Sequence, residues 1–336
     1  VFIYRPLRGH KYVNISTAGL IKCNSAVNEK GIVIGGHFMG FDGTGPRGLS
    51  YTVLQHEIMR KASSIDEAVA IVKSGRRAGA FGYMIVDGNR RDAVAIEANA
   101  DTVGLKRMKD GALVLTNFAT TPELETVDLM RRYNMVMRDL FGRYNRLGEL
   151  IAASRGRITP ATAAAFMGDR LDIVTRTERA TGITVGAANN VTSAVFVPED
   201  GVVWMAAGVE PACDGVFYGF DVRAELAGTA PRKLRALPGY AWKDRSKRKG
   251  LGHFMKAYAG HEENPFDTAE IMTHLDAAIA LDPREPIYLR LKASLMLSSG
   301  TYKEAVTLLE KSLNMPQSNS ERAHALLLAG QGLDLM

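Results

Sequence analysis

The sequence predicts an α+β sandwich followed by a separate, smaller helical domain. Strand patterns come first, helical spacing follows, and strand patterns return before residue 225. Such an order is typical of stacked sheets that are covered by helices. From about residue 265 to the C-terminus only helical patterns are present. A chain of 336 residues is long enough to bury two cores, which fits this division.

The N-terminal part holds the predicted strands. "KYVNIST" alternates apolar and polar residues, and "GIVIGGHF" is a short apolar run bounded by glycines, which is typical of a strand buried on both faces. Asp-Gly or Asn/Asp turns separate further predicted strands at "AFGYMIVDG", "AVAIEAN", "TVGLKRM" and "ALVLTNF". A hairpin turn joins the last two strands, "VTSAVFVPEDG" and "VVWMAAGVE".

Helices are predicted between these strands from periodicity and capping residues. Ser64, with Glu67 three residues later, resembles a capping box that opens the helix "IDEAVAIVKS". A long helical stretch covers residues 123–156. The next helix, "TPATAAAFMGDRL", has Thr159 as its N-cap and Pro160 at its first position.

Composition places a boundary after the predicted sandwich. Residues 226–262 are rich in glycine, proline and basic side chains, so we predict a linker between a domain of residues 1–225 and one of residues 263–336. The net charge is +6 and the sequence pI is about 9.2. Much of this excess lies in "WKDRSKRKG", residues 242–250. Basic clusters can bind nucleic acid or anionic lipid, but this run is short and has one flanking aromatic, so a solvated linker is the favoured interpretation.

The helical domain repeats itself with a period of 34 residues. Leu275 corresponds to Leu309, and Ala278 corresponds to Ser312. The small, turn and aromatic residues that a helix-turn-helix repeat needs are Ala293, Gly300, Tyr302 and Ala305. The pattern resembles a tetratricopeptide repeat. Since only about two copies are present, we expect the array to be stabilised by the larger domain or to continue beyond Met336.

Several classes of site and location find no support in the sequence. No run of 18 apolar residues predicts a membrane span, and neither a membrane nor nucleic acid is a predicted partner. Two cysteines are too few for a disulfide framework or a zinc site, and the glycine-rich "GFDGTGPRG" lacks a Walker-type ending, so no metal or organic cofactor is predicted. The chain opens with "VFIYRPLRGH", inside a strand-like run, so we expect a fragment or a processed form and leave its compartment open.

An ordered series of motifs gives residues 1–225 a family resemblance. The series is "GLI", "NEKGIVIGGH", "DEAVAIV", "AFGYMIVD" with "AVAIEAN", "ALVLTNF" and "NVTSAVFVPEDGVVWMAAG". It resembles the acyl-coenzyme A:isopenicillin N acyltransferase-like family, the C45 peptidases, which are related to choloylglycine hydrolases. The resemblance implies an N-terminal-nucleophile fold of four layers, αββα. It also implies cleavage of a linear amide or transfer of its acyl group.

Such chemistry needs a nucleophile, a base and donors for an oxyanion. The resemblance implies a cysteine at a free N-terminus whose own α-amino group is the general base. It places Asn117 and His37 among the oxyanion donors and Ser193 near the site, although family members often carry Asn at the position of His37 and His at that of Phe118. Structural roles are the alternatives: Asn117 as the cap of a strand end, His37 in strand-end packing, and Ser193 as a strand residue with a satisfied hydroxyl.

The chain itself offers no suitable nucleophile. Cys23 has 22 residues before it, so it lacks a free α-amino group and is interpreted as a small buried hydrophobe. Cys213 has the same defect, and Val1 has no nucleophilic side chain. In the family the nucleophilic cysteine lies upstream of the point that matches Val1.

Two functions are therefore predicted as alternatives. The first is an N-terminal-nucleophile amidohydrolase or acyltransferase for a small-molecule amide or acyl substrate, inactive in the chain as given. The second is a catalytically degenerate domain whose helical repeats bind a peptide or protein partner.

Overall fold

The structure is a computed structural model that describes residues 1–133, 137–208, 210–264 and 268–336. The chain forms two compact units. The first contains residues 1–166 and 192–239, and the second contains residues 167–191 and 240–336. No helix in the described part of the chain combines the length and the apolar character that a membrane crossing needs.

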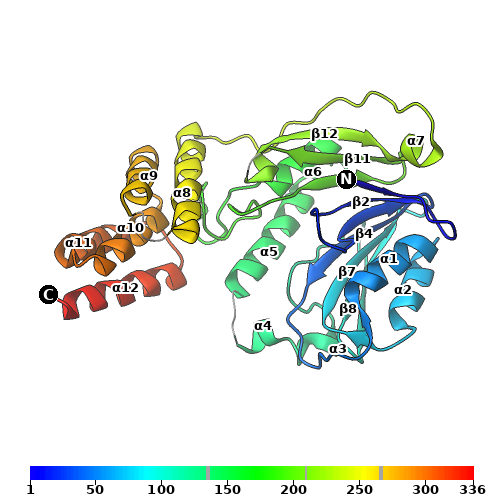
Figure 1. Cartoon of the computed structure of the whole chain (residues 1–336), viewed down its shortest axis with the longest axis horizontal. Helices are drawn as coiled ribbons and strands as arrows, with labels where there is room; N and C mark the ends of the chain where they lie inside the picture. The colour runs from blue at the N-terminus through cyan, green and yellow to red at the C-terminus, as the bar shows by residue number, and fades with distance from the viewer. Residues whose placement is uncertain (134–136, 209, 265–267) are drawn as a thin grey trace. The chain divides into compact units, whose positions relative to one another are not determined.

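A seven-stranded antiparallel sheet forms the centre of the first unit (Figure 1). Its order is β1-β2-β3-β4-β7-β8-β9. The strands are β1 (Phe2–Tyr4), β2 (Tyr12–Ile15), β3 (Ser25–Asn28), β4 (Ile32–Phe38), β7 (Phe81–Asp87), β8 (Asp92–Ala98) and β9 (Val103–Arg107). β4 and β7 pair along their whole length, from Ile32 opposite Asp87 to Phe38 opposite Phe81. Two short strands, β5 (Leu49–Ser50) and β6 (Arg77–Ala78), pair in parallel.

Each face of this sheet is covered by a different layer. Helices α1 (Tyr51–Lys61) and α2 (Ile65–Lys73) cover one face and share a core with the strands. A three-stranded antiparallel sheet covers the other face, as Figure 1 shows; it consists of β10 (Ala194–Val197), β11 (Val202–Ala207) and β12 (Val216–Asp221). Helix α7 (Val222–Ala227) follows β12 and contributes Val222 and Leu226 to the core between the sheets.

The "NEKG" turn at residues 28–31 joins the sheet to α1. The buried Asn28 side chain donates to the carbonyl oxygens of Met59 and Ala62 at 3.0 and 2.8 Å, where α1 ends. Its Oδ1 accepts from the backbone N–H groups of Lys30 and Ile32. Gly31 has φ 79°, a conformation that favours glycine. Asn28 and Gly31 therefore form the turn between β3 and β4.

Four helices follow β9. They are α3 (Pro122–Glu125), α4 (Leu129–Arg132), α5 (Met137–Ala153) and α6 (Pro160–Met167). The predicted stretch 123–156 thus contains three helices, and its residues 134–136 lie outside the described residues. The predicted strand "ALVLTNF" is not a strand: after an isolated bridge at Ala112, residues 113–116 form no regular element and residues 117 and 118 form a bend. This segment contacts α5 instead, through Phe118.

The second unit is helical. Its helices are α8 (Arg245–Glu263), α9 (Thr268–Leu281), α10 (Pro286–Ser298), α11 (Tyr302–Leu313) and α12 (Asn319–Asp334). α11 begins 34 positions after α9, and the corresponding residues Leu275 and Leu309 are both fully buried. Residues 265–267 of this predicted domain lie outside the described residues. The identification of these helices with tetratricopeptide repeats stays a prediction.

Two features of the second unit differ from the predicted linker and domain boundaries. Residues 245–263, placed in the linker, form helix α8, because Leu251, Phe254 and Ala257 make an apolar stripe that is buried in this unit. The basic residues around this stripe gave the segment the composition of a linker. In addition, residues 167–191, which come before β10 in the chain, belong to the second unit. The fold class is confirmed: the chain is α+β, with stacked antiparallel sheets and a C-terminal helical region.

Candidate functional site

The first candidate residue, His37, lies near the C-terminal end of β4. It is opposite Gly82 of β7, and Phe38 ends the strand. The preceding glycine is required by space, since a Cβ at Gly36 would lie 2.4 Å from Nε2 of Gln55. The "GGH" motif therefore lets α1 approach the sheet beside His37.

Asn117 reaches the same strand end from a different part of the chain. Its Nδ2 donates to the carbonyl oxygen of Phe38 at 2.9 Å, and its Oδ1 accepts from Nη2 of Arg143 at 3.2 Å. Arg143 is held in turn by Asp139, one helical turn earlier on α5, at 2.9 Å. Because a guanidinium can only donate, the orientation of the Asn117 amide is fixed. The second hydrogen on Nδ2 is thus left for another acceptor at the end of β4.

Buried carboxylates hold the segment that follows Asn117. Glu97 on β8 accepts from the hydroxyls of Thr120 and Thr121 at 2.6 and 2.7 Å, and from both of their backbone N–H groups. Asp128 accepts from the N–H of Ala119 at 2.7 Å. These charge-assisted bonds tie the loop to the sheet and so fix the position of the asparagine.

Phe118, at the position where the family often has histidine, is a core residue. Its ring centroid lies 4.3 Å from that of Phe141 and 5.4 Å from that of Tyr144, both on α5. The side chain is buried. Its function is to pack this segment against the helix that carries Arg143.

The environment of His37 keeps its imidazole neutral. Burial, together with the smaller effect of the nearby Arg143 charge, lowers the pKa of His37 from its ordinary value to about 4. A neutral ring can donate one N–H and accept at its other nitrogen. The structure therefore brings His37 and Asn117 to one strand end, linked through Phe38 and Arg143.

This lowered pKa predicts a pH-dependent loss of stability that the variant His37→Asn removes. As pH falls from about 6.5 to 4, an unfolded histidine takes up a proton that the folded ring resists, so the wild type loses stability relative to the variant. We expect this difference to reach about 2 kcal/mol below pH 4, allowing for partial exposure of the ring, and to vanish above pH 7. Chemical denaturation of both chains at several pH values measures it. A difference that does not change between pH 7 and 4 would contradict the lowered pKa.

The remaining sequence candidates lie elsewhere. Ser193 is buried directly before β10 in the smaller sheet, where its carbonyl accepts from the N–H of Ala206 at 2.8 Å. Cys23 is fully buried in the core between the large sheet and α1, and burial raises the pKa of its thiol. Its interpretation as a small buried hydrophobe is confirmed. Cys213 is also buried, in a short 3₁₀ helix over residues 212–214.

Sequence reasoning missed Arg143. The only local signal was an Asp139–Arg143 pair with i,i+4 spacing on a predicted helix, which is common on solvated faces. Within the described ranges, no group of three or more His, Cys, Asp or Glu side chains could hold a metal ion.

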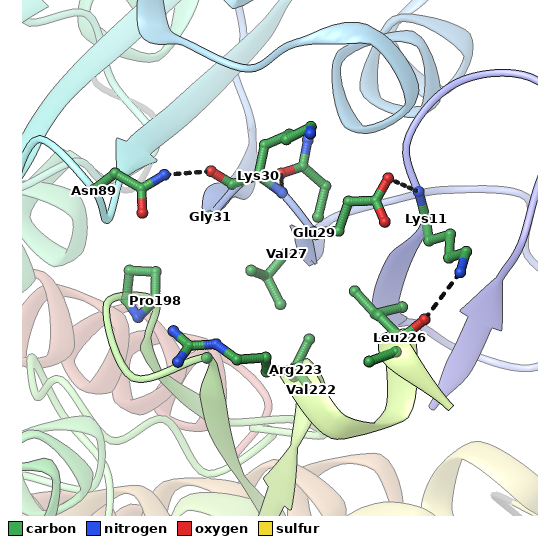
Figure 2. A pocket seen from close by; sticks show the side chains of 13 residues that line it. Lys11, Val27, Glu29, Lys30, Gly31, Asn89, Pro198, Val222, Arg223 and Leu226 are labelled. Carbon is green, nitrogen blue, oxygen red and sulfur yellow. Dashed lines mark hydrogen bonds between the residues drawn. The ribbon is translucent and has the colours of Figure 1, made fainter. Parts of the chain in front are cut away.

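A cavity of about 270 Å³ lies at the opposite end of β4 (Figure 2). Lys11 donates to the carbonyl of Leu226 at 3.2 Å, and Lys30 accepts from Asn89 through its own carbonyl. Figure 2 shows that the charged ends of Lys11, Lys30 and Arg223 point in different directions. Because these three side chains do not converge on one point, they are not arranged to bind one anion together.

Comparison with known proteins assigns the first unit to a family. The family model described as acyl-coenzyme A:6-aminopenicillanic acid acyl-transferase matches residues 1–210, which is more than half of the chain. The chain belongs to this family. The part of the chain that the acyl-transferase family model covers includes His37, Asn117 and Ser193.

The individual proteins that are similar to this chain share little sequence identity with it. An "Uncharacterized protein" of Archaeoglobus fulgidus is 25% identical over 176 residues, which are 46% of this chain and 29% of that protein. The chain thus spans less than a third of the length of this curated relative. The chain is also similar to two crystal structures of conjugated bile acid hydrolase from Clostridium perfringens, an arginine-to-leucine variant and a cysteine-to-alanine mutant. Each of these matches covers 70% of this chain and 84% of the hydrolase chain. Their TM-scores are 0.46 and 0.39, with 12% and 11% identity.

Proposed function

We propose that the protein is an N-terminal-nucleophile amidohydrolase or acyltransferase that acts on a linear amide. Family membership supports this class of reaction. The observation that carries the proposal is the amide of Asn117, which Arg143 fixes so that one N–H of Nδ2 is available at the end of β4. Both cysteines of the chain are buried. The nucleophile in this proposal is a cysteine upstream of Val1.

The proposed reaction has two halves. The thiol of the N-terminal cysteine loses its proton to its own α-amino group, and the sulfur attacks the carbonyl carbon of the amide. The carbonyl oxygen becomes an oxyanion that accepts hydrogen bonds from Nδ2 of Asn117 and from the neutral ring of His37. When the C–N bond breaks, the amine leaves with the proton from the α-ammonium group, and a thioester remains. Water or an acceptor amine then attacks the thioester carbon and gives a proton to the α-amino group. When the C–S bond breaks, the thiolate recovers that proton, and the acyl group leaves as a carboxylic acid or a new amide.

This mechanism gives each candidate residue a limited role. Asn117 and His37 stabilise negative charge, and Arg143 positions Asn117. No step is assigned to Ser193, which lies directly before β10 in the smaller sheet. None of these residues forms a bond to the acyl group, so the chain of residues 1–336 alone does not catalyse the reaction.

The first test is the N-terminal sequence and the intact mass of protein expressed from the full-length gene. We expect a mature chain that begins at a cysteine upstream of Val1, because the α-amino base exists only after cleavage. The matched control is the same gene with this cysteine changed to alanine, which we expect to remain uncut and inactive. A mature N-terminus without cysteine, serine or threonine would refute the proposal.

A second function is favoured if that test fails. The departures at His37 and Phe118 and the repeated hairpins of α9 to α12 would then define a degenerate domain that binds a peptide or protein partner through its helices. Helix α12 exposes apolar side chains that such a partner could cover, since Leu326 and Leu327 are 53% and 61% exposed. Turnover of amides by the mature protein would exclude this reading.

A further inference from the structure

A groove of about 640 Å³ runs along α5 in the first unit, and its lining does not include His37 or Asn117. One wall is the C-terminal half of α5, where Tyr144, Gly148 and Ile151 lie on one face of the helix. The other wall is the end of β9 with the turn that follows it, residues 106–114. The turn is closed by Asp110 and Gly111, which both have positive φ.

The floor of this groove is apolar. Leu113 and Val114 come from the turn segment, and Ile151 and Ile158 come from α5 and the residues after it. Ile158 is 44% exposed. Gly148 widens the groove in the middle, because a Cβ at this position would meet no atom within 4 Å. The groove is therefore an open apolar channel whose volume falls in the range of small-molecule sites.

The rim of the groove is cationic. Four basic side chains line it, namely Lys106, Arg107, Lys109 and Arg155, against one carboxylate among the described lining residues, that of Asp110. Lys106 donates to the hydroxyl of Tyr144 at 2.8 Å, and Arg155 donates to the carbonyl of Asp110.

The basic side chains at the rim differ in whether they are free to form an ion pair with a ligand. Arg107 is shared between Asp66 at 3.1 Å and Asp92 at 3.8 Å. Lys109 is exposed, and no hydrogen bond or ion pair joins its ammonium group to any side chain in the described ranges. The ammonium group of Lys109 is thus available to an anion.

We propose that this groove binds a medium-chain fatty acid anion. The alkyl chain lies over Leu113, Gly148 and Ile151, and the carboxylate meets Lys109 at the rim. Burial of each methylene contributes about 0.8 kcal/mol, and the ammonium group supplies the complementary charge. A single aromatic side chain, Tyr144, lines the groove among the described residues, so no series of rings is present on which nucleic-acid bases could stack.

Isothermal titration calorimetry of dodecanoate binding to the chain of residues 1–336 tests this inference. The decisive variant is Gly148→Leu, which fills the middle of the channel. Leucine favours the helix, so the melting temperature should not fall. The matched control is Ala153→Leu, at an exposed position of α5 that does not line the groove. We expect Gly148→Leu to raise the Kd for dodecanoate at least about tenfold and Ala153→Leu to leave it unchanged.

The charge requirement is tested separately. Lys109→Glu should raise the Kd for dodecanoate about tenfold, and dodecyltrimethylammonium should bind the wild type more weakly than dodecanoate does. Equal binding of dodecanoate by Gly148→Leu and the wild type would overturn the proposal, as would equal binding of the cationic amphiphile. Binding of the protein to vesicles of anionic phospholipid but not to dodecanoate would overturn the proposal and assign the groove to contact with a membrane surface. Because the lining residues do not include His37, Asn117 or Arg143, this result is independent of the proposed reaction.

Discussion

Replacing Arg179 by methionine is expected to destabilise the second unit by about 3–5 kcal/mol. The Arg179 guanidinium is buried, and it donates to Glu285 at 2.5 Å and to both oxygens of Glu321 at 2.8 and 3.0 Å. Glu285 is buried as well, at the start of α10. Without the arginine its carboxylate would be left uncompensated in a medium that solvates charge poorly.

The pH dependence of this loss identifies its cause. Burial raises the pKa of Glu285, and the charge of Arg179 opposes that rise. In Arg179→Met the pKa of Glu285 rises further, so the folded variant prefers the protonated carboxyl. A group with a raised folded pKa stabilises the fold at low pH and loses that contribution as pH rises through the folded pKa. The penalty of the variant should therefore be largest near pH 7 and should shrink as pH is lowered toward 4.

Chemical denaturation followed by the helical circular dichroism signal measures this effect. The control is Lys292→Met in the same unit, because the partner of Lys292, Asp276, is largely exposed. We expect that variant to lose less than about 1 kcal/mol. The double variant Arg179→Met, Glu285→Gln should recover part of the loss, since the buried Glu285 carboxylate is then neutral while Glu321 keeps its ion pair with Arg290 at 3.5 Å. A loss for Arg179→Met no larger than that for Lys292→Met would show that the network contributes little.

This network also explains why residues 167–191 belong to the second unit. Arg179 joins that segment to the starts of α10 and α12, and Thr181 donates to Glu285 at 2.9 Å. The two glutamates lie 106 and 142 positions after the arginine. No local pattern in the sequence relates residues so far apart. The sequence therefore predicted one boundary, near residue 225, whereas the chain passes between the two units more than once.

Features that depend on neighbouring residues were predictable from the sequence. The turn at Asn28 and Gly31 follows from turn chemistry, and Ser64 accepts from the N–H of Glu67 as an N-cap should. The burial of Cys23 follows from its place among strand residues. By contrast, α8 was hidden because its basic residues dominate the composition. Arg143 was hidden because the contact between α5 and Asn117 depends on tertiary packing.

Changing Asn117 to alanine is expected to lower kcat/KM of the mature, full-length enzyme by about 10²–10³-fold, and this prediction rests on the proposed function. The change removes one donor to the oxyanion, whose charge develops only in the transition state, so the loss should fall on kcat more than on KM. The fold should be little affected, because among the described residues the amide bonds only the Phe38 carbonyl and Arg143. Melting temperature and mature N-terminus, measured on the same preparation, check that folding and maturation are intact.

Two further variants separate donation from positioning. Asn145→Ala, an exposed asparagine on α5, is the matched control and should leave kcat unchanged. Arg143→Met keeps the Asn117 amide but frees its orientation, so a smaller loss is expected, on the order of tenfold, and Arg143→Lys should recover part of it. Since the charge of Arg143 also lowers the pKa of His37, Arg143→Met should shift the acid limb of the pH–rate profile to higher pH, which a purely structural role would not do. If Asn117→Ala retained full kcat, the asparagine would be a cap for the end of β4, and the oxyanion would have to be stabilised by other groups.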